Sequence, residues 1–274
     1  MLKAQLDKYI LEYETKDFIK DDPVQFIHRY SDVKDVEIAG FIASMYAYGK
    51  REVFIEKLNY IFNLMQNKPL DYIKSFDCKT NICGCDYRFS KDCDFIQIIK
   101  ILNKLYNENE SIKSLFEDNY NGDVWLMLQG VTDYFYNNVD MDVTKGFYHM
   151  LPNPAKKSAM KRMNMLLRWF VRKSAVDIGI WDFVSTSELL IPLDTHVAKI
   201  SRKLGLLKRN DNGYESVIEI TNNLKKFDPI DPIKYDFALF GYGVNNKVWK
   251  WKKVKLKRSP NATRTSFTDC FNFH

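Results

Sequence analysis

Lys161 and Asp194 are the two residues of this chain whose types and setting could do chemistry together. Lysine is a poor nucleophile at its ordinary pKa of about 10.4, and it becomes reactive when it is desolvated or surrounded by other cations. Lys157, Arg162 and Arg168 lie near Lys161 along a predicted helix and provide such a surrounding. A carboxylate at a helix start can stabilise a developing positive charge. The pair therefore has the groups needed to displace a base from a deoxyribose and to form a Schiff base with the sugar.

The lysine is predicted to lie on a helix that covers residues 157–173. At about 100° per residue, one polar stripe of this helix holds Lys157, Lys161, Asn164, Arg168 and Arg172. The burying surface comes from apolar residues elsewhere on the helix, namely Met163, Leu166, Leu167, Phe170 and Val171. The cationic stripe could contact phosphates, and a plain solvated helix face is the alternative interpretation.

The aspartate is predicted to be the N-cap of a second helix. Pro192 stops the segment before it, and Val197, Ile200 and Leu204 give the following residues one apolar face. Gly205 stands where a C-terminal cap belongs. Asp194 is thus a capping residue first, and catalysis is an additional hypothesis.

The rest of the chain predicts an all-α fold. Helices are expected at residues 1–20, 36–48, from 52 to about 65, 95–106, 111–116, 125–136, 214–224 and 233–240, the last ended by Gly241. The helix at 36–48 is apolar all round, which predicts a central position. Residues 1–246 are expected to form one helical unit with its chemistry in residues 145–207. Residues 247–274 are expected to form a basic tail.

Charge is distributed unevenly over a chain of 274 residues with a net charge of +6. Residues 145–176 contain eight Lys or Arg and no Asp or Glu, and residues 247–274 contain eight against one acid. The remainder is therefore acidic. Two basic segments on an acidic body favour a partner that carries phosphates.

The composition predicts a folded cytoplasmic protein. No run of about 18 apolar residues is present, and the first residues turn polar at once, which argues against a membrane span and a secretory signal. Five cysteines give no disulfide framework. Cys78, Cys83, Cys85 and Cys93 cluster in one irregular stretch, but their spacing differs from that of common zinc sites, so we predict no metal.

Several sequence blocks resemble known families. Leu193-Asp194-Thr195-His196-Val197, followed by Ile200 and Leu204-Gly205-Leu206, resembles a block of the helix-hairpin-helix DNA glycosylases of the endonuclease III type. Other blocks span nearly the whole chain to about residue 243 and resemble a bacterial family, domain of unknown function 2400, that is related to this superfamily. They are Asp35-x-Glu37-Ile38-Ala39-Gly40-Phe41, Ala47-Tyr48-Gly49, Tyr87-Arg88-Phe89, Ser158-Ala159-Met160-Lys161-Arg162-Met163-Asn164, Arg168-Trp169, Val176-Asp177-x-Gly179-x-Trp181 and Asp231-Pro232-x-Lys234-Tyr235-Asp236-Phe237-Ala238-Leu239-Phe240-Gly241.

The resemblance implies a helix-hairpin-helix glycosylase-like fold with a cleft between two helical subdomains. It places the catalytic aspartate at Asp194. It also implies DNA as the partner, and no membrane. The iron–sulfur cysteines of endonuclease III are absent, because only Cys270 lies near the C-terminal end, so neither a cluster nor another cofactor is expected.

The nucleophilic lysine has two candidate positions. Residues 151–159, Leu-Pro-Asn-Pro-Ala-Lys-Lys-Ser-Ala, resemble the hairpin motif Leu-Pro-Gly-x-Gly-x-Lys-Thr-Ala without its glycines, which makes Lys157 the nucleophile. The longer separation from Lys161 to Asp194 resembles the archaeal 8-oxoguanine glycosylase branch. We favour Lys161 and keep Lys157 as the alternative.

Two functions follow as hypotheses. The first is a DNA-repair glycosylase, with or without lyase activity on the abasic sugar, and the second is a nucleic-acid-binding protein that has the fold without the chemistry. Tyr48 or Trp169 could stack on an extruded base in the first case. The candidate DNA-contacting residues are Lys156, Lys157, Arg162, Arg168, Arg172 and His196. The sequence carries no signal for an oligomeric state.

Overall fold

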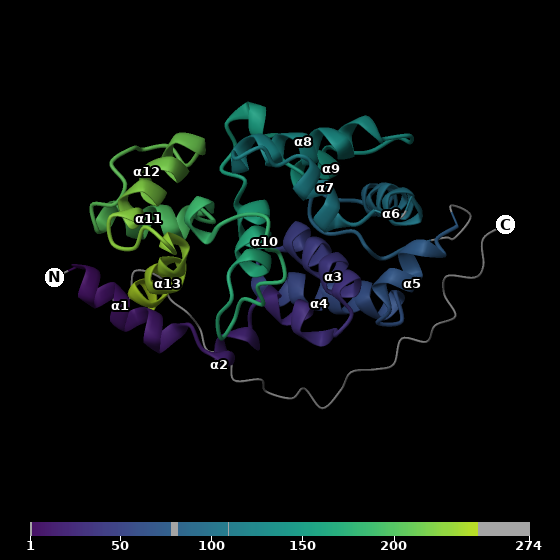
Figure 1. Ribbon diagram of the computed structural model, residues 1–274. Helices are drawn as coiled ribbons and strands as arrows, with labels where there is room; N and C mark the ends of the chain where they lie inside the picture. Colours follow the sequence, from purple (N-terminus) through teal and green to yellow (C-terminus); the bar gives the residue numbers. More distant parts are fainter. Residues whose placement is uncertain (1, 78–81, 109, 246–274) are drawn as a thin grey trace.

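The computed structural model describes residues 2–77, 82–108 and 110–245, and these residues form helices joined by loops (Figure 1). Within these ranges the extended pairings are two isolated bridges, Tyr87 with Ser90 and Lys173 with Ile178. The all-α prediction is therefore confirmed. The predicted basic tail and Cys78 lie outside the described residues.

The α-helices of the described ranges are α1 (Leu2–Tyr13), α2 (Lys16–Ile19), α3 (Val33–Tyr46), α4 (Arg51–Leu64), α5 (Pro69–Lys74), α6 (Asp92–Asn107), α7 (Ile112–Asp118), α8 (Val124–Asn137), α9 (Lys145–Met150), α10 (Lys161–Val171), α11 (Thr195–Lys203), α12 (Tyr214–Lys225) and α13 (Tyr235–Asn245). Short 3₁₀ helices are η1 (Pro23–Arg29), η2 (Pro154–Lys156), η3 (Thr186–Glu188) and η4 (Pro232–Lys234). Most predicted helices agree with these bounds to within about three residues. In Figure 1, α10 lies between a group formed by α1, α11, α12 and α13 and a group formed by α3 to α9.

Helix α3 is the central helix that its apolar sequence predicts. Asp32 caps its start, since the carboxylate accepts hydrogen bonds from two backbone N–H groups of the first turn at 2.9 and 3.1 Å. Every residue from 36 to 46 is buried. A Cβ on Gly40 would lie 2.3 Å from Cζ of the buried Phe170 of α10. The glycine therefore allows α3 and α10 to pack closely.

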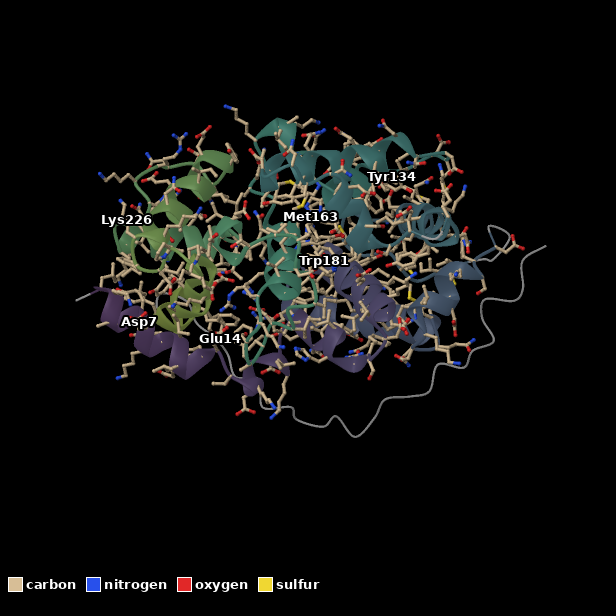
Figure 2. The ribbon with its side chains drawn as sticks, viewed as in Figure 1. Asp7, Glu14, Tyr134, Met163, Trp181 and Lys226 are labelled. Atoms are coloured by element: carbon tan, nitrogen blue, oxygen red, sulfur yellow. The ribbon has the colours of Figure 1, made fainter. Side chains whose placement is uncertain are left out.

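A buried carboxylate connects α3 to more distant parts of the chain. Glu37 accepts hydrogen bonds from the Trp181 indole at 3.2 Å and from the Tyr106 hydroxyl at 3.3 Å. Burial raises the pKa of Glu37, and these donors counteract that effect. Trp181 lies among the side chains at the centre of the molecule (Figure 2). Glu37 thus links α3 with α6 and with the loop that follows α10.

Helix α10 is shorter than predicted. It begins at Lys161 and not at Lys157, because Asn153 caps the turn η2 and the chain then passes through left-handed residues at Lys157 (φ 55°) and Met160 (φ 49°). The Lys157 carbonyl accepts a hydrogen bond from the Tyr214 N–H at 3.0 Å, which attaches this segment to the start of α12. The predicted stripe from Lys157 to Arg172 therefore does not exist as one helix face.

Helices α1 and α13 pack against each other. The Tyr235 hydroxyl donates to Asp7 at 2.9 Å, and a Cβ on Gly241 would lie 2.3 Å from Cδ2 of Tyr13. The prediction that Gly241 ends the last helix is wrong, because this glycine serves a close helix contact and α13 continues to Asn245. The prediction of one helix over residues 1–20 is also wrong, since extended backbone at Thr15 separates α1 from α2.

Candidate functional site

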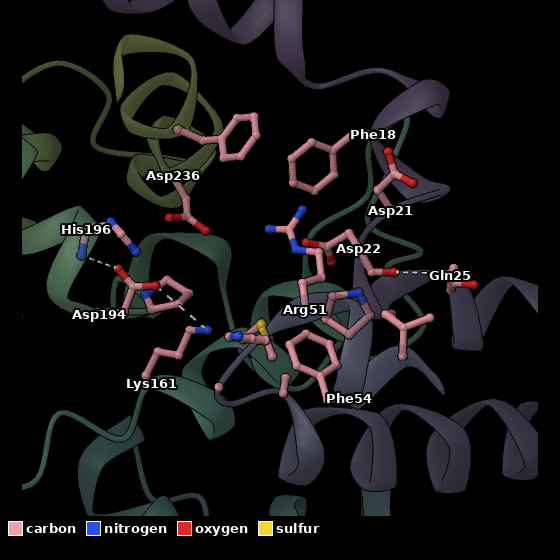
Figure 3. Close-up of a pocket in the computed structure, with 18 of the residues that line it drawn as sticks. Phe18, Asp21, Asp22, Gln25, Arg51, Phe54, Lys161, Asp194, His196 and Asp236 are labelled. Carbon is pink, nitrogen blue, oxygen red and sulfur yellow. Dashed lines mark hydrogen bonds and ion pairs between the residues drawn. The ribbon is translucent and has the colours of Figure 1, made fainter. Parts of the chain in front are cut away.

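A cleft of about 1070 Å³ lies beside α10, and Figure 3 shows the side chains that line it. Its walls come from the residues before and within η1, from the start of α4, and from α10, α11 and α13. Four phenylalanines, one histidine and a mixture of acids and bases face the space. Phe18, Phe54, Phe237 and Phe240 are these aromatic residues. The cleft can therefore accept a flat ring beside charged groups.

Lys161 and Asp194 meet on one wall of this cleft. The Nζ atom of Lys161 lies 4.0 Å from Oδ2 of Asp194, and the side chains are 32% and 36% exposed. Lys161 is the first residue of α10, at the helix end that borders the cleft. The two residues that the sequence singled out, 33 positions apart, are thus brought into one ion pair (Figure 3).

Each oxygen of Asp194 has its own role. Oδ1 accepts hydrogen bonds from the backbone N–H groups of His196 and Val197 at 2.8 and 2.9 Å, which caps α11 as predicted. Oδ2 faces Lys161. The two cap hydrogen bonds fix the orientation of the carboxylate. The same bonds that stabilise the start of α11 therefore also hold Oδ2 toward the cleft.

A second carboxylate of the cleft, Asp236, is one that the sequence reasoning missed as a functional residue. Burial raises its pKa to about 6, while the charge of Arg168 lowers it, the charge of Asp194 raises it and that of Lys161 lowers it. Arg168 also donates a hydrogen bond to it. Asp236 therefore belongs to the same electrostatic group as the Lys161–Asp194 pair. The only sequence signal was its place in the block of residues 231–241, which assigned it no role.

Three predicted DNA-contacting arginines are buried inside the fold. Arg162, Arg168 and Arg172 are 8%, 4% and 3% exposed. Arg162 donates to the carbonyls of His149 and Met45. In the described chain these groups do not form a phosphate-contacting stripe, and we correct that interpretation. Helical periodicity cannot distinguish a solvated arginine from one that has a distant buried partner.

Asp177 explains why two of these arginines are buried. Its carboxylate, fully buried, lies 3.2 Å from the Arg168 guanidinium and also accepts a hydrogen bond from Arg172. Arg172 forms further ion pairs with Glu14 and Asp231, each at 2.9 Å. These bonds tie α10 to the chain segments next to α1 and η4. The basic residues of α10 therefore stabilise the fold around the site.

The remaining predicted contact residues are exposed. Lys156 is exposed, and His196 is exposed on the wall of the cleft. Lys157, with 75% of its side chain exposed, lies 3.8 Å from Glu215 of α12. The structure thus pairs Lys161 with Asp194 and pairs Lys157 with a different carboxylate. These three residues are the part of the predicted DNA surface that stays accessible.

The opposite wall of the cleft carries charges of both signs. It contains the acids Asp21, Asp22, Glu52 and Glu56 and the bases Lys20, Lys50 and Arg51. Asp22 and Arg51 lie across the pocket from Lys161 in Figure 3. This mixture suits a polar ligand held by specific hydrogen bonds more than a run of phosphates.

Among the described residues, no three His, Cys, Asp or Glu side chains gather as a metal site requires. Of the cysteine cluster, Cys85 is buried, and Cys83 and Cys93 are partly buried. None of the described helices combines the length and apolar character needed to cross a bilayer.

Comparison with known proteins gives one match. The model of a family described as a protein of unknown function (DUF2400) matches residues 22–245. No curated protein and no solved structure matches the chain. The matched range contains the whole cleft wall formed by α4, α10 and α11, together with Asp236.

Proposed function

The chain belongs to this family of unknown function, and from that premise we propose that it is a DNA glycosylase with a lysine-dependent lyase step. The observation that carries the proposal is the Lys161–Asp194 pair, 4.0 Å apart on the wall of a cleft of about 1070 Å³. A lysine and a carboxylate within reach of one another, beside flat apolar side chains, are the groups that this reaction needs.

The first step breaks the bond between base and sugar. Unprotonated Nζ of Lys161 attacks C1′ of the deoxyribose, and the electron pair of the glycosidic bond leaves with the base. Positive charge develops on C1′ and on the ring oxygen, and Oδ2 of Asp194 stabilises it. Lys161 first loses a proton to water, so that Asp194, 4.0 Å away, stays ionised and can stabilise this charge. The departing base takes up a proton from water.

The second step follows from the amine that is now attached to C1′. Loss of its proton and opening of the sugar ring give a Schiff base between Lys161 and the sugar. Water takes the C2′ proton, the C3′–O bond breaks, and the 3′ phosphate leaves. Water then hydrolyses the Schiff base and releases the lysine. Because burial raises the pKa of Asp236 to about 6, this carboxylate adds a negative charge beside the Lys161–Asp194 pair above that pH.

The hairpin part of the resemblance also supports the proposal. Lys157 and Met160 adopt left-handed backbone conformations although neither is a glycine. Such conformations are uncommon and persist where the surroundings hold them. The segment therefore keeps a tight turn before α10, as a helix-hairpin-helix protein needs. A glycosylase-like fold with two helical subdomains around the cleft is part of this proposal.

One observation favours the alternative, a nucleic-acid-binding protein without chemistry. Asn153 and Ala155 occupy the positions of the two hairpin glycines, and a side chain there hinders close approach of the backbone to a phosphate. In that case the exposed Lys156 and Lys157 would bind phosphates, Asp194 would only cap α11, and Lys161 would only form an ion pair with it.

Borohydride trapping on duplexes with damaged bases and abasic sites tests the proposal. The parent is expected to form a covalent adduct, Lys161→Ala is expected to lose it, and Lys157→Ala is the matched control that keeps it. Asp194→Asn retains an N-cap, because asparagine caps helices as well as aspartate does. It should therefore fold like the parent while adduct formation slows by about a hundredfold.

Two results would contradict the proposal. An adduct that persists in Lys161→Ala and disappears in Lys157→Ala would move the nucleophile to the other lysine. Absence of any adduct and of base release on every lesion would remove the chemistry, and duplex binding that weakens with salt would then favour the binding protein.

A further inference from the structure

A tight turn next to a residue of the cleft lining contains one strained backbone conformation. Tyr87 and Ser90 exchange two backbone hydrogen bonds at 2.9 and 3.0 Å, which leaves Arg88 and Phe89 at the tip. Arg88 has φ of 52°, a left-handed conformation that non-glycine residues rarely adopt. Strain of this kind persists only where neighbouring groups impose the conformation.

The base of the turn is braced on two sides. The Tyr48 hydroxyl donates to the Tyr87 carbonyl at 2.7 Å, and the Tyr87 hydroxyl donates back to the Tyr48 carbonyl. A Cβ on Gly49 would lie 2.6 Å from Nη1 of Arg88, and one on Gly146 would lie 2.2 Å from the Phe89 carbonyl oxygen. Both glycines therefore permit contacts that a side chain would hinder, and the base of the turn is closely packed.

The tip of the turn, in contrast, projects into solvent. Phe89 is 55% exposed, and Arg88 is exposed beside it with its guanidinium carbon 5.4 Å from the ring centroid. The inner side of the Phe89 ring contacts His149, with 4.9 Å between centroids. A closely packed turn thus presents a large apolar ring and a cation to the outside.

The position of the tip relates it to the cleft. Gly49, which packs on Arg88, is one of the residues that line the cleft. His149, beneath Phe89, accepts a hydrogen bond from Arg162, the residue next to Lys161. The tip therefore lies a few side chains from the start of α10 and from the lining of the cleft.

We propose that Phe89 inserts into the gap that an extruded base leaves in a duplex, where it stacks on the neighbouring bases while Arg88 contacts the adjacent backbone. The proposal rests on the glycosylase function above. Enzymes that act on an extruded base must compensate for lost stacking, and apolar side chains inserted between bases do so. Arg88 provides the charge that holds such a tip at a phosphate chain.

Binding to a duplex that contains a tetrahydrofuran abasic analogue, compared with the same duplex intact, tests the tip without requiring chemistry. Phe89→Ala should weaken binding to the abasic duplex by about tenfold and leave the intact duplex nearly unchanged. Phe89→Trp should restore it. Ile230→Ala, at a site 74% exposed and outside the cleft lining, is the matched control and should change neither.

A fluorescent 2-aminopurine beside the abasic position supplies a second readout. Stacking quenches this base, so the parent should lower its emission and Phe89→Ala should not. Equal affinities of parent and Phe89→Ala for the abasic duplex, or equal losses on both duplexes, would overturn the proposal.

The outcome separates this proposal from the function on which it rests. If the parent binds abasic DNA through Phe89 but forms no borohydride adduct, the proposed lyase step is wrong and the proposed role of Phe89 stands. If the parent forms the adduct but its binding does not depend on Phe89, the proposed chemistry stands and the proposed role of Phe89 is wrong. If the parent binds neither duplex, both proposals are wrong.

Discussion

His149 is a single residue on which stability at low pH depends. Its ring packs on Tyr48 and Phe89, and its buried Nδ1 has no hydrogen-bond partner within the described part of the chain. Burial lowers the pKa of His149 to about 4, and the charges of Arg162 and Arg88 contribute. The unfolded chain takes up a proton at this residue near pH 6.5, whereas the folded chain does so only near pH 4. The stability that this difference provides is therefore complete above pH 6.5 and is lost as the pH falls toward 4.

The variant His149→Phe keeps the aromatic contacts and removes the titration. We expect this group to lower the free energy of unfolding of the parent by about 2 kcal/mol between pH 7 and pH 4.5. Over the same range the free energy of unfolding of the variant should therefore fall by about 2 kcal/mol less than that of the parent. Urea unfolding at the two pH values measures it. Equal pH dependence in both proteins would show that His149 does not cause the loss.

At the scale of elements, close packing of α3 against α10 holds the helix that carries Lys161. Gly40→Ala places a methyl group 2.3 Å from Cζ of Phe170, a fully buried ring. Although alanine favours a helix over glycine by about 1 kcal/mol, we expect a net destabilisation of about 2 kcal/mol.

Denaturant unfolding of Gly40→Ala, with Gly130→Ala of α8 as the control, checks this expectation. The three atoms nearest to a new methyl group at position 130 all belong to the Asn119 side chain, which is partly exposed and can turn away. The control should change stability by less than about 1 kcal/mol. A Gly40 variant as stable as the parent would mean that the two helices can separate at little cost.

Elements could be predicted where a local signal ends them. Asp194 and Gly205 bound α11 in the sequence, and the structure confirms the cap and gives Gly205 the left-handed φ of 73° that its position predicts. The sequence failed at Lys157 and Met160, where non-glycine residues turn the chain. It also failed at Gly241, where a helix contact and not a helix end requires the glycine.

The site shows the same limit. The Lys161–Asp194 pair could be proposed because one connection joins the two helices that carry it. Asp236 lies on a third helix, and only packing brings it to the pair. The partners of Arg168 and Arg172 are equally distant in sequence, so these arginines could not be distinguished from surface cations.

At the scale of the whole molecule, the buried ion pairs around Asp177 hold several segments together. Removing this carboxylate leaves Arg168 and Arg172 partly uncompensated in the interior. We expect Asp177→Asn to lower the free energy of unfolding by about 3 to 5 kcal/mol, because a buried charge without its partner is costly.

The matched control is Asp182→Asn, five residues further along the chain. Asp182 pairs with Lys113 at 2.8 Å with 87% of its side chain exposed, so its loss should cost less than about 1 kcal/mol. Thermal or urea unfolding of the two variants compares them directly. Similar stabilities would show that the buried ion pairs contribute no more than the surface one.

The packing of α1 on α13 has a consequence for the order in which the molecule assembles during its synthesis. Asp7 and Tyr235, which share a hydrogen bond, are 228 positions apart. At a translation rate of about 5 to 20 residues per second, roughly 10 to 45 seconds separate the two helices as they leave the ribosome. Throughout that interval α13, the helix against which α1 packs, has not yet been made. Helix α1 therefore reaches its final packing long after it is made, and its apolar face is available to chaperones during that interval.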